Sequence, residues 1–301
     1  KPYLYYAALE NGFTSSTSFT SQKTTFNLSN NQTYSPKNNN DVYGNKPISM
    51  ATAIAYSEKI YSVKTHLFLG EDTLVNMAKK VGITEKLQAI PSLPLGTNEI
   101  NIMEMAGGYS AFANLGYRVK PHLIKKIEDK NGNVLYEYKQ EKTKVLDSSL
   151  CFILNNMLTA TYDADYIDYN YPTAIGIASR MTHKYSLKSG TTSTDNWNIG
   201  FNPDVLTAVW VGYDDNTELK SSEYKYSQNI WLTSMEDYLK DKPDNWYEVP
   251  DNVSTVLVEP ISGKPASESD SKKKLMYFLK GTEPTDSDPV FDEKLNNSTA
   301  S

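Results

Sequence analysis

The sequence predicts an α+β fold in which a helical layer packs on an antiparallel β-sheet. Two observations carry this prediction. Up to His183 the apolar residues recur with the 3.6-residue period of amphipathic helices, and after it they alternate with a period of two. Because helices come first and consecutive strands follow, the order favours separate helical and antiparallel layers over alternating strand–helix units.

Helical patterns with start and stop signals divide the first part of the chain. Residues 101–116 form the strongest pattern, in which Asn101 and Glu104 have the spacing of a capping box. We expect one helix to begin at Pro47 and another to have Asp72 as its N-cap. The other helices are expected at residues 2–12, 60–70, 147–159 and 230–240.

The strand patterns predict an antiparallel meander and a separate hairpin. Asn202-Pro203-Asp204 supplies a turn inside the meander, and Asn131-Gly132 is the turn of a β-hairpin over residues 122–139. Residues 13–46 are rich in Ser, Thr and Asn and predict a mostly irregular excursion over the surface. The three strands of the meander are expected at residues 184–192, 196–201 and 205–212.

The character of the chain changes near residue 244, where prolines, charges and short strand-like runs become frequent. We therefore predict one large domain over residues 1–243 and a small β-rich extension over residues 244–301. The last residues of the extension are expected to be disordered.

Composition excludes several classes of site. The net charge of −6 and the pI of about 5.2 argue against a nucleic-acid partner. Cys151 is the single cysteine, so no intrachain disulfide can form, and its place in an apolar helical pattern indicates a buried, inert thiol. The histidines His66, His122 and His183 lie far apart without metal-ligand spacing, so no metal site is expected.

No run of 18 or more apolar residues occurs, and no signal peptide is visible. The chain begins with Lys1-Pro2 rather than with methionine. We therefore expect it to be a fragment of a longer protein.

The stretch Lys188-Ser189-Gly190-Thr191-Thr192 has the composition of a site that binds a carboxylate and a carbonyl together. Lysine supplies a positive charge, the hydroxyls donate hydrogen bonds, and glycine lets a substrate backbone approach a strand closely. A Lys-Ser-Gly triplet arises often by chance, so its meaning depends on the segments upstream of it.

Those segments supply a family resemblance. Lys1, the triplet Ser57-Glu58-Lys59 and the triplet Lys188-Ser189-Gly190 resemble, in order and spacing, the S-x-x-K, S-x-N and K-T/S-G motifs of the penicillin-binding transpeptidases. The flanking segments resemble the class A, bifunctional branch of that family. These segments are residues 34–57, 91–124, 188–215 and 258–284.

The resemblance implies a D,D-transpeptidase that cross-links peptidoglycan stem peptides ending in D-Ala-D-Ala through a serine acyl-enzyme, binds β-lactams and needs no cofactor or metal. It implies that Lys1 is the general base and that Ser57 relays a proton to the leaving amine. It also implies that Lys188, Ser189 and Thr191 hold the substrate carboxylate. Gly190 and Thr192 complete the substrate-binding stretch, and the Thr191 N–H supplies half of an oxyanion hole.

Two positions depart from the family pattern. The nucleophilic serine should precede Lys1 by three residues, so we expect the given chain to be inactive and the serine to lie in a longer parent. Lys59 occupies the position of the second-motif asparagine, and lysine offers donors and a charge where asparagine offers a donor and an acceptor. A cation there either helps by lowering the pKa of Lys1 or indicates an impaired parent.

Several alternatives stay open. Taken singly, Ser57 fits a polar residue that only ends a helix, and Lys188 fits a surface lysine on an edge strand. Within the serine acyl-transferases, a D,D-carboxypeptidase and a β-lactamase are rivals, although no segment resembles the loop that holds the glutamate-bound water of class A β-lactamases. A non-catalytic scaffold protein of the cell-wall machinery is the rival from another class.

The resemblance further implies a glycosyltransferase domain and a membrane anchor upstream, and a location on the extracytoplasmic face of the bacterial membrane.

Overall fold

The computed structural model describes residues 1–28 and 32–292. A three-stranded antiparallel sheet lies at its centre in the order β11–β10–β9, as the alternating pattern predicts. In register, Ile199 of β10 lies opposite Lys188 of β9. The strands are β9 (Ser186–Thr191), β10 (Asp195–Phe201) and β11 (Leu206–Gly212).

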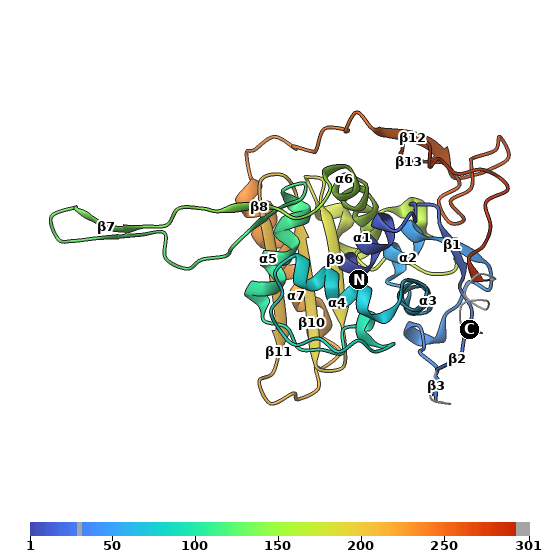
Figure 1. The fold of residues 1–301 in the computed structure, drawn as a ribbon, viewed down its shortest axis with the longest axis horizontal. Coiled ribbons are helices and arrows are strands. Elements are labelled where there is room, and N and C mark those ends of the chain that lie inside the picture. Colours follow the sequence, from blue (N-terminus) through green and yellow to red (C-terminus); the bar gives the residue numbers. More distant parts are fainter. Residues whose placement is uncertain (29–31, 293–301) are drawn as a thin grey trace.

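Helices cover both faces of this sheet (Figure 1). On one face, Trp231 of α7 packs against Gly200 and Leu187, while Phe201 on the other face contacts Tyr109 of α5. The predicted helical layer on an antiparallel sheet is therefore confirmed, with α7 forming a second layer behind the sheet. The helices are α1 (Pro2–Glu10), α2 (Met50–Tyr56), α3 (Lys59–Leu69), α4 (Glu71–Lys80), α5 (Ile102–Ala113), α6 (Ser148–Met157) and α7 (Tyr226–Leu239).

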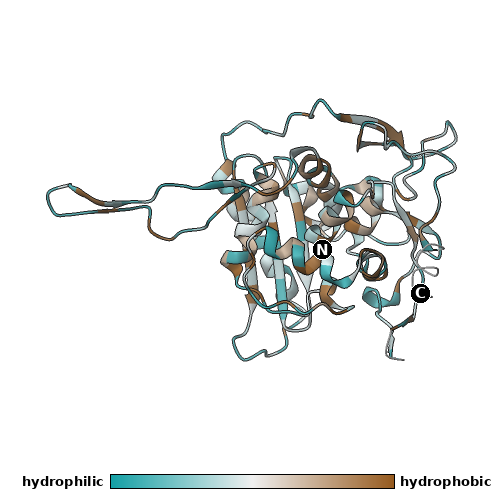
Figure 2. Cartoon of the chain, viewed as in Figure 1, coloured by the Kyte–Doolittle hydropathy of each residue, from teal (hydrophilic) through white to brown (hydrophobic). Residues whose placement is uncertain are grey.

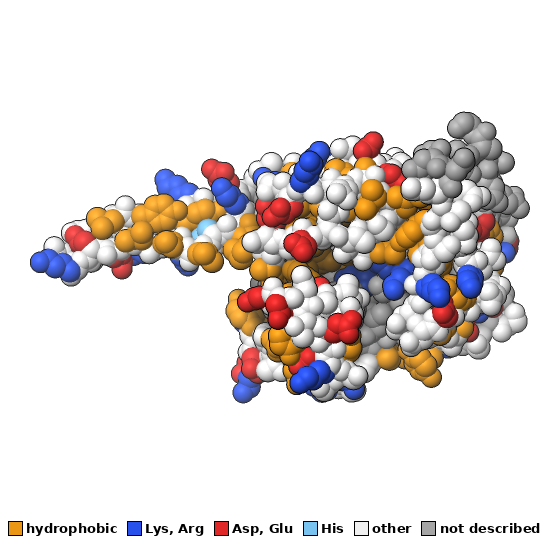
Figure 3. Space-filling view, turned by 90° about the horizontal axis from the view of Figure 1, so that it is seen from below, with side chains coloured by type: hydrophobic (Ala, Val, Ile, Leu, Met, Phe, Trp, Pro, Cys, Tyr) orange, Lys and Arg blue, Asp and Glu red, His pale blue; other side chains and the backbone are white. Residues whose placement is uncertain are grey.

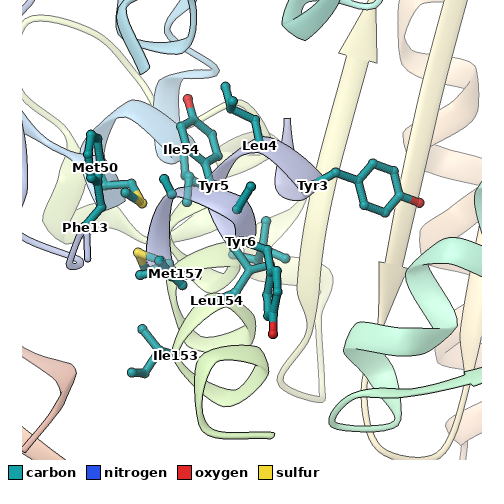
Figure 4. Close-up of a cluster of buried hydrophobic side chains, with 14 of the residues drawn as sticks. Tyr3, Leu4, Tyr5, Tyr6, Phe13, Met50, Ile54, Ile153, Leu154 and Met157 are labelled. Carbon is teal, nitrogen blue, oxygen red and sulfur yellow. The ribbon is translucent and has the colours of Figure 1, made fainter. Parts of the chain in front are cut away.

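Helix α1 runs through the centre of the main core (Figure 4). Every residue of this helix from Pro2 to Leu9 is buried, because its neighbours α3, α4 and α6 surround it. Tyr5 is fully buried, and its hydroxyl forms a hydrogen bond of 2.9 Å with the Ser62 hydroxyl of α3. Such a helix holds Lys1, at its N-cap, in a fixed place.

Short two-stranded sheets lie around the central sheet and its helices. The β6–β7 hairpin, which the Asn131-Gly132 pair predicts, projects far from it as an arm (Figures 1 and 3). These strands are β1 (Ser18–Thr20) with β4 (Pro47–Ser49), β2 (Phe26–Asn27) with β3 (Thr33–Tyr34), β5 (Tyr117–Val119) with β8 (Lys142–Lys144), β6 (Lys126–Glu128) with β7 (Val134–Glu137), and β12 (Val253–Val258) with β13 (Lys274–Leu279).

The β-rich extension after residue 244 contains the β12–β13 ribbon, which packs on α6. Val258, Met276 and Phe278 of this ribbon are buried in the same core cluster as α1 (Figure 2 shows the apolar ribbon segments). The predicted disorder of the last residues concerns positions 293–301, which lie outside the described part of the chain.

Two predicted helix starts are wrong. Pro47 belongs to β4, and α2 begins only after Ser49, whose hydroxyl accepts from the Thr52 N–H at 3.1 Å. Gly70 rather than Asp72 is the N-cap of α4, so Asp72 lies in its first turn, where a carboxylate favours the helix dipole. The predicted start of α5 at Asn101 is confirmed, but its capping box differs from the prediction.

That capping box is only half formed. The Asn101 side chain accepts from the Met103 N–H at 2.8 Å, as predicted. The Glu104 carboxylate instead accepts from the Thr84 N–H at 2.9 Å and so ties α5 to the segment after α4. A tertiary partner has replaced the local one.

Cys151 is fully buried, as predicted, and burial raises the pKa of its thiol. The described ranges contain no cluster of three or more potential metal-ligating side chains. Among the helices described, none is both long and apolar enough to cross a bilayer.

Candidate active site

The turn between α2 and α3 presents the Ser57 side chain. Ser57 ends α2 in the left-handed conformation, with φ 55° and ψ 39°. Its N–H donates to the Ile54 carbonyl and the Glu58 N–H donates to the Ala53 carbonyl, which closes α2 with backbone bonds. The chain then reverses at once into α3, so the Ser57 hydroxyl stands at the apex of the turn.

Two lysines from distant segments converge on this hydroxyl. The Nζ of Lys1 lies 3.2 Å and the Nζ of Lys188 lies 3.0 Å from the Ser57 Oγ. Lys1 also donates to the Ser57 carbonyl at 2.5 Å, and Lys188 donates to the Ser189 carbonyl at 2.6 Å. The structure thus brings together three predicted site residues that are separated by 56 and 131 positions in the chain.

Burial makes both amines easier to deprotonate. Burial lowers the pKa of Lys1 well below its ordinary value, the charges of Lys188 and Lys59 lower it further, and the charge of Glu58 opposes them. Burial lowers the pKa of Lys188 to about 7. Near neutral pH the two amines and the hydroxyl between them can therefore exchange protons along one short chain.

Glu58 is a site residue that the sequence did not single out. Its side chain is buried and accepts hydrogen bonds from the Ser21 hydroxyl at 2.9 Å, the Asn38 amide at 2.7 Å and the Tyr61 N–H. This carboxylate is the negative charge that raises the pKa of Lys1. The partners Ser21 and Asn38 come from the irregular excursion, so no local pattern could have indicated them.

Lys59 begins α3 next to this carboxylate. Its N–H donates to the Asn38 Oδ1 at 2.9 Å, whereas its ammonium has neither a hydrogen bond nor a carboxylate within 4 Å among the described residues. The Lys59 side chain is partly exposed, and its charge is close enough to lower the pKa of Lys1. Lys59 therefore adds a positive charge beside the two amines at Ser57.

The third-motif stretch forms an edge of the central sheet. The Thr192 N–H donates to the Asp195 carbonyl at 2.9 Å where β9 turns into β10. Hydrogen-bonded and open pairs alternate along an antiparallel ladder, so Thr191 and Asn196 form an open pair and the Thr191 N–H points away from β10. On the described part of the sheet, this N–H faces the free side of β9.

The remaining residues of this stretch differ in how open they are. Gly190 faces open space, because, apart from its chain neighbours, a Cβ there would have one described neighbour within 4 Å, the Trp197 Cβ at 3.6 Å. The Thr191 Oγ1 accepts from the Asn196 amide at 3.2 Å, and Ser189 is partly exposed. The Thr192 hydroxyl instead accepts from the Asp195 N–H at 2.9 Å and so serves the turn.

The family models match most of the chain. Residues 1–236 match the penicillin-binding protein transpeptidase domain, and residues 249–293 match the C-terminal domain of penicillin-binding protein 1A. The chain is 44% identical over 286 residues to penicillin-binding protein 2D of Bacillus subtilis, covering 94% of this chain and 41% of that protein. It is 32% identical over 293 residues to penicillin-binding protein 1A of Aquifex aeolicus, covering 94% of this chain and 38% of that protein. The chain thus spans about two fifths of these relatives.

Solved structures show the same architecture. The crystal structure of penicillin-binding protein 1A from Haemophilus influenzae matches with a TM-score of 0.85 and 26% identity, covering 95% of this chain and 48% of that one. The PonA1 protein from Mycobacterium tuberculosis in complex with penicillin V shares the fold, with a TM-score of 0.67 at 19% identity over 82% of this chain and 69% of that one. By its family match, its relatives and its fold, the chain belongs to the transpeptidase domain family of the penicillin-binding proteins.

Proposed function

We propose that the parent of this chain is a D,D-transpeptidase that cross-links peptidoglycan through a serine acyl-enzyme. The observation that carries the proposal is the pair of buried amines, Lys1 and Lys188, that meet at the Ser57 hydroxyl beside the free edge of β9. A buried, deprotonated amine is what a serine nucleophile needs as a base, and a free strand edge suits a peptide substrate.

In this proposal the nucleophile is a serine that precedes Lys1 by three positions. Neutral Lys1 takes the proton of that hydroxyl while the oxygen attacks the carbonyl carbon between the two terminal D-alanines. The C–N bond then breaks, and the departing amine receives a proton through the Ser57 hydroxyl. Lys188, on the other side of Ser57, lowers the energy of the charges that form during this transfer.

The free edge of β9 supports substrate binding by strand addition. The Thr191 N–H is available to the substrate carbonyl oxygen, and the open space above Gly190 lets a backbone approach the strand. We assign the hydroxyls of Ser189 and Thr191 to the substrate carboxylate, together with the charge of Lys188. A β-lactam presents a carbonyl and a carboxylate in the same arrangement and would acylate the same serine.

Labelling the longer parent with a fluorescent penicillin tests this proposal. We expect covalent label on the wild type, loss of label when the serine before Lys1 is replaced by alanine, and strong loss in the Lys1→Met variant. A wild type that takes no label but gains it in the Lys59→Asn variant would assign the parent to the impaired alternative. No label in either protein would favour the scaffold alternative.

Product analysis separates the enzyme classes. With a stem peptide as donor and an amine as acceptor, a transpeptidase forms the cross-linked amide, whereas a D,D-carboxypeptidase or a β-lactamase passes the acyl group to water.

The proposal extends to an upstream glycosyltransferase domain, a membrane anchor and an extracytoplasmic location, and it requires no metal or cofactor. Its support is the likeness to the 1A and 2D penicillin-binding proteins.

A further inference from the structure

Three amines and one carboxylate meet at the second motif. The amines of Lys1, Lys59 and Lys188 lie at or near the Ser57 turn, and Glu58 is the carboxylate that faces them. The oxygens of Glu58 are already occupied by three donors, and its side chain is buried. The carboxylate therefore cannot turn toward Lys59 without breaking those bonds.

The three lysines are not equivalent. Lys1 and Lys188 are committed to Ser57 and to backbone carbonyls. Lys59 is partly exposed, and its ammonium has no partner within the described residues. Its position at the first turn of α3 adds the positive end of that helix to its own charge. An anionic group of the substrate is the partner that this arrangement lacks.

We propose that Lys59 is a specificity-determining residue that selects acyl donors carrying a second carboxylate close to the reacting carbonyl. The first carboxylate, that of the terminal D-alanine, binds at Lys188 and the β9 hydroxyls, and the second binds at Lys59. In a stem peptide, this second group is a free side-chain carboxylate next to the scissile D-alanine, as opposed to its amide. The inference rests on the proposed function.

The chemistry of the side chain at position 59 determines whether a carboxylate or an amide binds better. An asparagine at position 59 would offer one donor and one acceptor and would suit a neutral amide. Lysine offers only donors and a full charge, so it favours a carboxylate over the amide of the same shape. Because Glu58 is buried, its carboxylate does not pair with the Lys59 ammonium and does not cancel this preference for a carboxylate.

Two β-lactams that differ by one carboxylate provide the test. Benzylpenicillin and carbenicillin share the ring and the phenylacetyl chain, and carbenicillin adds a carboxylate next to the side-chain amide. The measurement is the second-order acylation rate of the longer parent with each compound at low ionic strength. We expect the ratio of the carbenicillin rate to the benzylpenicillin rate to fall about tenfold from the wild type to Lys59→Asn.

Control variants isolate the charge. Lys59→Arg keeps the charge and should keep the ratio, whereas Lys23→Asn removes an exposed lysine of the excursion and should leave it unchanged. Raising the salt concentration should lower the ratio in the wild type more than in Lys59→Asn, because a partly exposed pair is screened.

The outcomes distinguish the two proposals. Acylation of the wild type by both compounds with a ratio that Lys59→Asn does not change would overturn the inference alone. No acylation of the wild type by either compound would overturn the proposed function and the inference with it. A ratio that rises in Lys59→Asn would show that Lys59 repels the second carboxylate and would also overturn the inference.

Discussion

At the scale of single residues, the site depends on two amines that the fold holds out of water. Lys1 and Lys188 approach the same hydroxyl within 3.2 Å, and burial lowers the pKa of each amine. Two ammonium groups so close would repel one another, so the arrangement favours the loss of a proton. The same burial that suits the chemistry imposes a cost on folding.

The Lys188→Met variant makes this cost measurable through pH. The pKa of Lys188 is about 7 in the folded protein against an ordinary 10.5, so between these values the unfolded chain binds more protons. The free energy of unfolding of the wild type should therefore rise with pH across this window. Chemical denaturation at pH 6.5 and pH 9.5 should show that the free energy of unfolding of the wild type, minus that of Lys188→Met, rises by about 3 kcal/mol between the two pH values.

The amine of Lys1 changes the pH dependence of unfolding in the same direction. Removing the charge of Lys188 also raises the pKa of Lys1, which flattens the pH response of the variant. A difference between the two proteins that stays constant between the two pH values would mean that Lys188 keeps its proton in the folded protein. The exposed variant Lys23→Met is the control and should follow the wild type at both pH values.

At the scale of elements, the Ser57 turn combines a proposed catalytic position with an unfavourable backbone conformation. A residue with a side chain is strained at φ 55°, and glycine is not. Ser57→Gly and Ser57→Ala both lose the hydroxyl, so their difference reports the backbone alone. We expect the glycine variant to unfold with a free energy about 1 kcal/mol higher than that of the alanine variant, measured by denaturant titration; equal values would contradict the strain.

The contact between α7 and the sheet gives a second prediction at this scale. A Cβ at Gly200 would lie 2.4 Å from the Trp231 Cζ2 and 2.8 Å from the Leu187 Cδ1, and the fully buried indole has no space to retreat. Gly200→Ala should lower the free energy of unfolding by about 2 kcal/mol. Gly176→Ala, whose Cβ would lie more than 4 Å from every described residue beyond its own stretch of chain, should change it by less than about 0.5 kcal/mol.

Local sequence signals predicted the elements well where the partners are local. The strands β9 to β11, the hairpin turn at Asn131-Gly132 and the Asp147 cap of α6 all follow from adjacent residues. The errors occur where a distant partner competes. Glu104 bonds to Thr84 instead of closing its own helix, and β4 forms at Pro47 because β1 pairs with it.

At the scale of the whole molecule, the C-terminal extension packs into the transpeptidase body. Its ribbon shares a core cluster with α1, and the Ser49 and Thr52 hydroxyls of the second-motif segment donate to the Pro260 carbonyl at 3.0 and 2.9 Å. The extension therefore supports the helix that presents Ser57. The boundary at residues 243 and 244 stays a prediction.

An ion pair near the end of the described chain tests this coupling. Lys64 of α3 is 2% exposed and pairs with Asp292, which also accepts from the Thr20 N–H. Asp292→Asn would leave a buried ammonium without its carboxylate, so we expect a loss of about 3 kcal/mol in the free energy of unfolding. Asp41→Asn removes half of the exposed pair with Lys37 and should change it by less than about 0.5 kcal/mol.

Denaturant titration of both variants checks this prediction, with the wild type as reference. A loss as small for Asp292→Asn as for Asp41→Asn would show that water replaces the lost carboxylate and that the extension is only loosely attached. The arm of β6 and β7 contributes nothing comparable, because its strand residues are exposed throughout.

The sequence by itself determined the order of the three motifs, the alternation of the strands and the family to which the chain belongs. These features depend on neighbouring residues and on the spacing between motifs, and both can be read directly from the order of residues in the chain. Only the tertiary structure decided that Lys1 and Lys188 meet at Ser57, and that Glu58 is buried with partners from the irregular excursion. It also decided that the ammonium of Lys59 has no partner among residues 1–28 and 32–292. The physical reason is that pKa and charge balance depend on distance and on exclusion of water, and both are set by packing between segments that lie far apart in the chain.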